Sequence, residues 1–311
     1  MTGAVTRGPV AVATAGIGLV TAATADCYSH LGSFALSGAA SCTLYPEDAV
    51  PGEIAGIIGP ESHEVMGNGV DQYTNVSVPT LTPFIVQGSD VAVVIAPGGG
   101  YSILDFNGEG ADIAAWLNSI GVSAFLLKYR VPERPWLGFG GAPLMDAQRA
   151  VGLLRFKAQE LGLNASKIGF MGFSAGGHLT AHISNNYSAR SYARVDAADD
   201  VSARPDFALL IYPWALVSDD TPSSRLLVNV SASTPSSFLA QAEDDGTAPV
   251  ENSIFYFLGL KRAKAAPSEL HVFPSGGHGF GICRHPEKDP HLEACSWPIL
   301  AASFLRARGI L

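Results

Sequence analysis

Short apolar runs alternate with segments of helical periodicity along most of the chain. The runs at residues 91–96 and 122–129 are typical of strands buried on both faces of a parallel sheet. Residues 143–161 instead repeat apolar positions at helical spacing, with Leu144, Ala147, Val151 and Leu154 on or near one face. This alternation predicts an α/β fold with a mostly parallel central sheet and helices on both of its faces.

The same periodicities place the other elements. Strands are expected at residues 81–86, 167–171, 207–212, 237–242 and 270–273, and helices at 111–119, 178–184, 250–261 and 296–308. Residues 26–72 are rich in Gly, Ser and Pro and show no clear period, which predicts an irregular extension. No linker divides residues 73–311, so they are expected to form one catalytic domain.

The N-terminus has the pattern of a secretory signal peptide over residues 1–25. Arg7 supplies a positive charge, residues 8–25 are uncharged, and Ala23-Thr24-Ala25 fits a small-x-small cleavage site. An anchor helix or an unstructured tail is the alternative, although the Gly-, Ala- and Thr-rich run is short for crossing a bilayer. The signal peptide predicts an extracellular protein.

Composition and charge narrow the function. Hydrophobic residues make up 47% of the 311 residues and charged ones 15%, as in a globular protein with a large core. A formal charge of −9 without any Lys/Arg cluster argues against nucleic-acid partners. Beyond the N-terminus no stretch is long and apolar enough for a membrane span, and no motif for a cofactor or a metal is found.

The cysteines and the sequons agree with export. All 4 cysteines come after the expected cleavage point. The local pairs Cys27–Cys42 and Cys283–Cys295 are the simplest of the three possible pairings. The sequence contains no Cys-x-x-Cys motif, which argues against a zinc site. Acceptors for N-glycosylation begin at Asn75, Asn164, Asn186 and Asn229, which favours a glycosylated secreted protein.

A candidate nucleophile lies in Gly172-Phe173-Ser174-Ala175-Gly176. An apolar strand precedes this segment and a helix comes directly after it. In that context a tight turn exposes the serine hydroxyl, and glycine is needed where the turn leaves little room for side chains. The five-residue pattern alone is weak, so its weight comes from the order of the other parts.

A glycine loop, Pro97-Gly98-Gly99-Gly100, comes directly after the buried run at 91–96. Consecutive glycines let backbone N–H groups face a ligand, as an oxyanion hole requires. We expect the N–H groups of Gly98, Gly99 and Ala175 to form that hole. A flexible turn or a phosphate loop is the alternative, but the loop lacks a subsequent Gly-Lys-Ser/Thr.

The best candidate base is His278, which lies among glycines after the last predicted strand. His178 and His182, on the helix after Ser174, are interpreted as packing residues. The acid is expected within Glu243-Asp244-Asp245, at the end of the 237–242 strand. Spacing alone leaves open which of these carboxylates reaches His278.

These parts together resemble the α/β-hydrolase superfamily, and within it the secreted esterases similar to bifunctional feruloyl and acetyl xylan esterases. The resemblance covers residues 75–308, and its most specific segments are Pro97-Gly98-Gly99-Gly100-Tyr101, Leu127-Lys128-Tyr129-Arg130-Val131-Pro132, Gly172–Leu179, Pro249-Val250-Glu251-Asn252-Ser253 and Gly276–Gly281. It implies that the acid lies four positions before Pro249, which favours Asp245 over Asp244. Pro97, where lipase-like relatives have histidine, also favours the esterase-like group.

The expected function is a secreted serine carboxylesterase that hydrolyses short acyl esters, above all acetyl, on carbohydrate such as xylan. Ser174, His278 and Asp245 would act as the triad, without a cofactor or a metal. A serine peptidase of the same fold and a non-catalytic binding relative are the alternatives. The sequence leaves the oligomeric state open.

Overall fold

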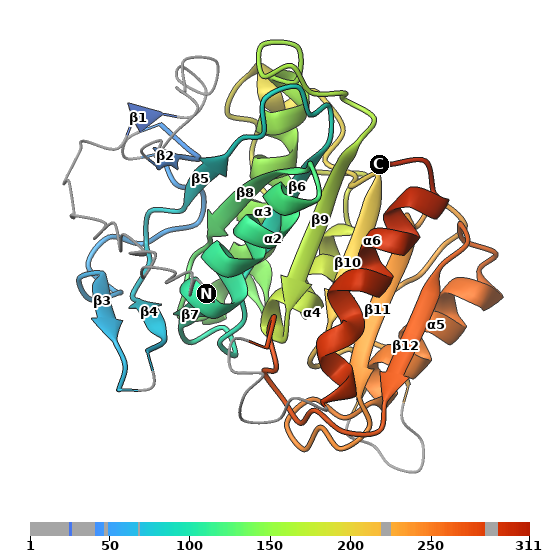
Figure 1. The fold of residues 1–311 in the computed structure, drawn as a ribbon. Coiled ribbons are helices and arrows are strands. Elements are labelled where there is room, and N and C mark those ends of the chain that lie inside the picture. The colour runs from blue at the N-terminus through green and yellow to red at the C-terminus, as the bar shows by residue number, and fades with distance from the viewer. Residues whose placement is uncertain (1–24, 27–40, 47–48, 68, 219–224, 284–291) are drawn as a thin grey trace, which may run out of the picture.

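The computed structural model describes residues 25–26, 41–46, 49–67, 69–218, 225–283 and 292–311. A nine-stranded sheet in the order β1-β2-β5-β8-β6-β9-β10-β11-β12 forms its centre (Figure 1). From β8 to β12 all neighbours are parallel, whereas β5 is antiparallel to both β2 and β8. The predicted α/β architecture with a mostly parallel sheet is therefore confirmed.

The strands of this sheet are short, and all except β1 and β2, which were not predicted, are close to their predicted bounds. They are β1 (Ala25–Asp26), β2 (Cys42–Thr43), β5 (Thr80–Phe84), β6 (Ala92–Ala96), β8 (Ser123–Lys128), β9 (Ile168–Phe173), β10 (Phe207–Ile211), β11 (Ser236–Ala242) and β12 (Glu269–Phe273). Strands β6, β9 and β10 are buried along their whole length, which explains their continuous apolar sequences.

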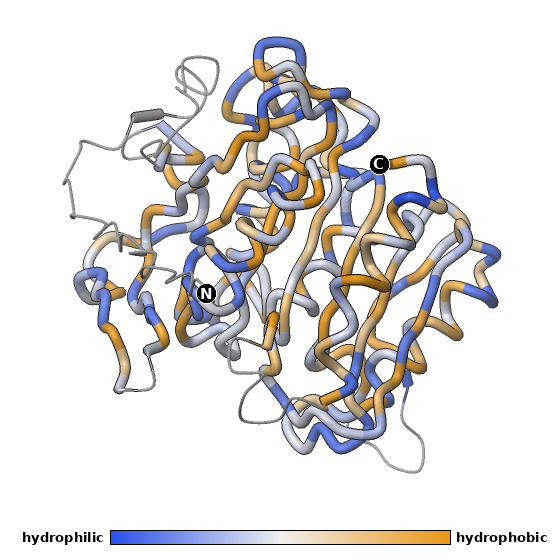
Figure 2. The backbone as a smooth tube through the Cα atoms, viewed as in Figure 1, coloured by the Kyte–Doolittle hydropathy of each residue, from blue (hydrophilic) through white to orange (hydrophobic). Residues whose placement is uncertain are grey.

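Helices cover both faces of the sheet. The helices are α2 (Asp112–Ser119), α3 (Gly141–Phe156), α4 (Ala175–Ile183), α5 (Glu251–Arg262) and α6 (Trp297–Ala307). Helices α2 and α6 pack on one face, and α3, α4 and α5 on the other (Figure 1). The tube of α6 is mostly orange to pale (Figure 2), in agreement with the buried side chains of Trp297, Ala301 and Phe304.

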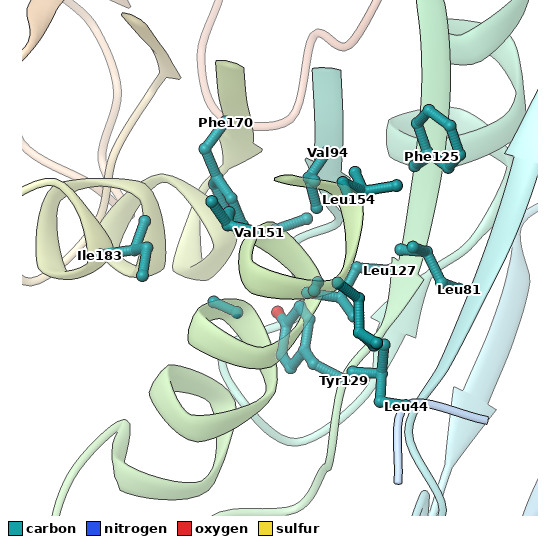
Figure 3. Packing of buried hydrophobic residues seen from close by; sticks show 14 of the residues in the cluster. Leu44, Leu81, Val94, Phe125, Leu127, Tyr129, Val151, Leu154, Phe170 and Ile183 are labelled. Carbon is teal, nitrogen blue, oxygen red and sulfur yellow. The ribbon is translucent and has the colours of Figure 1, made fainter. Parts of the chain in front are cut away.

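Alternate residues of the central strands supply the two halves of the core. Val94 and Phe170 point toward α3, where they pack with Val151 and Leu154 (Figure 3). Their neighbours along the strands, such as Val93 and Met171, belong to the cluster under α2 and α6. The period of two along each strand therefore fills both layers and fixes the register of the sheet.

The prediction of an irregular segment at residues 26–72 was wrong in part. Strand β2 joins the main sheet, while β3 (Ser62–Val65) and β4 (Asp71–Thr74) form a small antiparallel sheet with β7 (Leu104–Asp105). Strand β4 also crosses the predicted domain boundary at residue 73. Strands of two to four residues are too short for a period-two pattern to be recognised.

One of the two predicted cysteine pairs lies within the described residues. Cys283 and Cys295 form a disulfide, which joins the chain after β12 to the turn before α6. Cys42 is also disulfide-bonded, and Cys27, its predicted partner, lies outside the described residues. The predicted signal peptide is outside them as well, apart from Ala25 in β1. Within the described part of the chain, no helix has the length and apolar character to cross a membrane.

Candidate active site

All candidate functional residues lie just beyond the carboxyl ends of parallel strands. Gly98 comes after β6, Ser174 after β9, Asp245 after β11 and His278 after β12. Because these strands are parallel, their carboxyl ends lie at one edge of the sheet, where open α/β folds place their ligands. Residues that are 104 positions apart, Ser174 and His278, thereby come into contact.

Ser174 has the strained backbone expected of a nucleophile turn. Its φ is 51° and its ψ −116°, between the last residue of β9 and the first of α4. A non-glycine residue with positive φ costs on the order of 1–3 kcal/mol and persists only where its surroundings hold it. The side chain is nearly buried, at 8% exposure.

The two glycines of this turn are required by close backbone contacts. A Cβ atom on Gly172 would lie 1.9 Å from the carbonyl oxygen of Gly176, and one on Gly176 would lie 2.0 Å from that of Ala96. Both distances are far below van der Waals contact. The sequence interpretation of these positions therefore agrees with the packing.

His278 lies between the serine and a carboxylate. Its Nε2 is 2.8 Å from Ser174 Oγ, and its Nδ1 is 2.8 Å from Asp245 Oδ2. With Nδ1 protonated, the ring donates to Asp245 and accepts the serine hydroxyl proton at Nε2. The structure thus brings together the three predicted side chains in the order that a nucleophile, its base and an orienting acid require.

Asp245, and not Asp244, is the carboxylate that reaches the imidazole. Asp245 is 4% exposed, and its Oδ1 accepts the N–H groups of Thr247 and Ala248 at 2.9 and 2.8 Å. Asp244 instead accepts the N–H of Gly277 at 2.7 Å. The choice that spacing alone left open is therefore decided by geometry, with Asp244 placed on the backbone of the histidine loop.

The histidines of α4 pack as the sequence suggests. His178 Nδ1 lies 2.7 Å from the hydroxyl of Tyr101, and its ring stacks on that of His182 at 4.1 Å. Burial lowers the pKa of His178 well below its usual value and that of His182 to about 4. Both imidazoles are therefore neutral near pH 7.

The prediction for Gly98 requires correction. Its N–H donates to Oε2 of Glu109 at 2.6 Å and is not free for a substrate oxygen. No hydrogen bond between described residues uses the N–H of Gly99, Gly100 or Ala175. Gly99 and Gly100 line the same cavity as Ser174, which makes them better candidates for the loop's contribution to an oxyanion site.

Glu109 was not recognised from the sequence. It lies in a π-helical turn (η2, Asn107–Ala111) directly before α2, and it is 7% exposed. Its Oε1 accepts the hydroxyl of Tyr212 at 2.9 Å, which in turn accepts the N–H of Gly281 at 3.1 Å. Only the glycines on either side of Glu109 hint at special packing, and that signal is too general to identify a site residue.

Two cavities meet at the site. The first, of about 420 Å³, is lined by Ser174, His278 and Glu109 together with Gly99 and Gly100. The second, of about 560 Å³, is lined among others by Phe139, His178, His182, Trp214, Thr247 and Leu227. Trp214 and Thr247 line both cavities. Among the described residues, no group of three His, Cys, Asp or Glu side chains is arranged to hold a metal ion.

Comparison with known proteins agrees with the observed fold. A family model described as an alpha/beta hydrolase fold matches residues 93–241. The chain is 30% identical to the crystal structure of an acetyl ester-xyloside bifunctional hydrolase from Caldicellulosiruptor lactoaceticus, with a TM-score of 0.70 over 88% of this chain and 97% of that one. The chain belongs to the α/β-hydrolase family. The resemblance drawn from its motifs is confirmed.

Two curated relatives of this α/β hydrolase are larger proteins. This chain is 31% identical to the acetylxylan esterase of Xylanibacter ruminicola over 214 residues, a match that covers 61% of this chain and 41% of that protein. It is 31% identical over 226 residues to endo-1,4-beta-xylanase B of Butyrivibrio fibrisolvens, covering 66% of this chain and 35% of that protein. The chain thus spans less than half the length of either relative.

Proposed function

We propose that this α/β hydrolase is a secreted serine carboxylesterase that removes short acyl groups, above all acetyl, from carbohydrate such as xylan. The observation that carries the proposal is the continuous chain of contacts from Ser174 Oγ through His278 to Asp245. The names of the relatives, an acetylxylan esterase and an acetyl ester-xyloside hydrolase, support the choice of substrate.

The proposed reaction proceeds through an acyl-enzyme. Ser174 Oγ attacks the ester carbonyl while His278 Nε2 takes the hydroxyl proton, and Asp245 stabilises the imidazolium that forms. The oxyanion of the tetrahedral intermediate is met by the N–H groups of Gly99, Gly100 and Ala175. His278 then gives its proton to the departing sugar oxygen, and water, activated in the same way, releases the acid.

The lining of the second cavity, that of about 560 Å³, suits an uncharged leaving group such as a sugar. Among the described residues that line it there is no Asp, Glu, Lys or Arg, and its two histidines are neutral near pH 7. Phe139 and Trp214, whose ring centroids are 5.9 Å apart, offer apolar faces in this cavity, and Trp214 also lines the cavity that holds Ser174. Such walls suit the C–H face of a pyranose ring, with few polar groups needed to orient it.

Substitution of the nucleophile tests the reaction. Ser174→Ala should abolish hydrolysis of p-nitrophenyl acetate and labelling by a fluorophosphonate probe. Ser119→Ala, which changes an exposed hydroxyl that donates to the Trp116 carbonyl, is the matched control and should keep both. Wild-type rates from the Ser174→Ala protein would end the proposal.

The carbohydrate part is tested separately. Trp214→Ala should raise KM for acetylated xylo-oligosaccharide by roughly tenfold, and much less for p-nitrophenyl acetate, because only the sugar needs the aromatic wall. Release of acetate from acetylated xylan is the direct assay. An equal rise in KM for both substrates would contradict the proposed sugar site but not the esterase activity.

Secretion and glycosylation remain part of the proposal. The cysteine pairs and the sequons are compatible with an oxidising, glycosylating compartment. Asn164, Asn186 and Asn229 are exposed, whereas Asn75 is half-buried and its Nδ2 donates to the Pro60 carbonyl. Mass spectrometry of the protein recovered from its natural culture medium would test the cleavage site, the glycans and export together.

A further inference from the structure

Glu109 is a buried carboxyl group for which the proposed reaction has no use. It does not contact His278 through a hydrogen bond, yet it lines the cavity that holds Ser174. It projects from a single π-helical turn, a geometry that recurs at functional sites. A carboxyl group is rarely buried without a partner, and the partners of Glu109 all belong to loops of the site.

Each oxygen of Glu109 binds a different loop of the site. Oε2 accepts the N–H of Gly98, at the start of the glycine loop after β6. Oε1 accepts the hydroxyl of Tyr212, just after β10, and that hydroxyl accepts the N–H of Gly281 in the loop that carries His278. One side chain therefore links the loop with the candidate oxyanion donors to the loop with the base.

The backbone at these contacts is held in conformations that need support. Tyr212, which donates to Glu109, has a φ of 38°, a value that non-glycine residues rarely adopt. A Cβ atom on Gly98 would lie 2.5 Å from Glu109 Oε2 and 2.8 Å from Ser174 Cβ. A strained residue such as Tyr212 keeps its geometry only when surrounding contacts over-determine it, and Glu109 supplies one of these contacts while packing closely against Gly98.

We propose that Glu109 is a positioning residue that holds the glycine loop and the histidine loop in a fixed relation around Ser174. It acts through Gly98 and Tyr212 and not on the substrate. The inference rests on the proposed esterase function for its kinetic consequences, but not for its structural ones.

The ionised carboxylate suits this role better than the neutral acid, because Gly98 and Tyr212 both present donors to it. Burial and the charge of Asp105 raise the pKa of Glu109 to about 7, while the hydrogen bonds from Tyr212 and Gly98 and the charge of His278 oppose that rise. Tyr212 and Tyr129, which also face it, remain neutral because burial raises their pKa. A glutamine would set an NH₂ group against one of the two donors.

Kinetics of Glu109→Gln provide the first test. We expect kcat for p-nitrophenyl acetate to fall on the order of 10–100-fold, with KM within about threefold, because misplaced oxyanion donors weaken the transition state and not substrate binding. Tyr212→Phe should give a smaller loss. The double variant should be no worse than Glu109→Gln alone, since both substitutions break one chain of contacts.

Asp206→Asn is the matched control. Asp206 also accepts a backbone N–H, that of Ile168 at 2.9 Å, and pairs with Arg155, but it does so where β9 begins, at the far edge of the sheet. This variant should lower stability and leave kcat unchanged. If Glu109→Gln loses activity only in proportion to its unfolded fraction, as a general stability defect would, the proposal fails.

Two further measurements separate positioning from bulk stability. The wild-type kcat should show a loss as the pH falls through about 7 that Glu109→Gln does not show, because only the wild type has a carboxylate there to be protonated. Hydrogen exchange of residues 98–106 and 276–283 should be faster in Glu109→Gln and unchanged in Asp206→Asn. The exchange experiment needs no substrate, so it decides the inference even if the wild-type protein has no esterase activity; unchanged exchange in both loops would overturn it.

Discussion

Gln241 and Asp245 are joined by a hydrogen bond of 2.9 Å from Nε2 of the amide to Oδ2 of the carboxylate, the same oxygen that faces His278. Gln241 is fixed in turn, because its Oε1 accepts the hydroxyl of Ser253 at 2.9 Å and its Nε2 also donates to the Ala248 carbonyl. The acid is therefore oriented from the end of β11 and from α5 at once.

This arrangement separates the two neighbouring acids. Asp245→Asn should lower kcat by roughly 10⁴-fold, because an amide can leave His278 in the wrong tautomer. Asp244→Asn keeps an oxygen for the N–H of Gly277 and should cost less than about tenfold. Steady-state kinetics of the two variants side by side make the comparison; a greater loss from Asp244→Asn would reverse the assignment.

Alanine at Gly176 should be poorly tolerated. Its Cβ would lie 2.0 Å from the Ala96 carbonyl oxygen, a backbone atom of β6 that has no room to move. We expect a loss of unfolding free energy of more than about 3 kcal/mol, measured by urea denaturation. Gly67→Ala is the control, because a Cβ there meets nothing within 4 Å. Similar urea midpoints for both variants would contradict the packing argument.

The histidines of α4 should make the fold sensitive to acid. Burial lowers the pKa of His182 from 6.5 to about 4, so the folded state favours its neutral form. The stability that this provides is fully present above pH 6.5 and is lost as the pH falls toward 4, up to roughly 3 kcal/mol. His182→Gln should flatten that part of the curve of unfolding free energy against pH, and an unchanged slope would contradict it.

The titration of Glu109 should change the unfolding free energy with pH in the opposite direction. Because burial raises its pKa from 4.5 to about 7, the stability linked to it is fully present below pH 4.5 and is lost as the pH rises through 7. The unfolding free energy of Glu109→Gln relative to wild type should therefore improve from pH 5 to pH 8. Urea titrations at several pH values measure this difference, and a constant difference would show that Glu109 does not titrate in this range.

The disulfide between Cys283 and Cys295 should contribute to stability and not to chemistry. It closes a loop with a sequence separation of 12, for which chain entropy predicts roughly 3 kcal/mol. The double variant Cys283→Ser/Cys295→Ser should lower Tm by several degrees and keep kcat at temperatures where it is folded. A large loss of kcat in the folded variant would mean that the bridge also positions the histidine loop.

The fold and the three side chains that meet at the proposed active site could be predicted from the sequence because each leaves a local signal. Buried parallel strands read as apolar runs, and Ser174 and His278 stand among glycines that only tight turns require. Thr247 and Ala248 bind Asp245 through their backbone N–H groups, so these contacts do not depend on the identity of the two side chains. Local patterns of this kind can be recognised in the sequence before the tertiary structure is known.

The features that could not be predicted depend on contacts distant in sequence. The N–H of Gly98 is occupied because it donates to Glu109, which lies 11 residues away. Glu109 in turn accepts a hydrogen bond from Tyr212, which lies 103 residues further along the chain. The strands before residue 75 were missed because pairing with β5 and β7, and not their own periodicity, defines them. Long-range partners of this kind leave no pattern in a single sequence.

The three residues of the proposed triad come directly after β9, β11 and β12, and the glycine loop comes after β6. No contiguous fragment shorter than residues 98–278 contains all of them, so activity should return during refolding only when the last of these strands has docked. The recovery of activity would then report when the sheet is complete, and it should come later than the recovery of secondary structure.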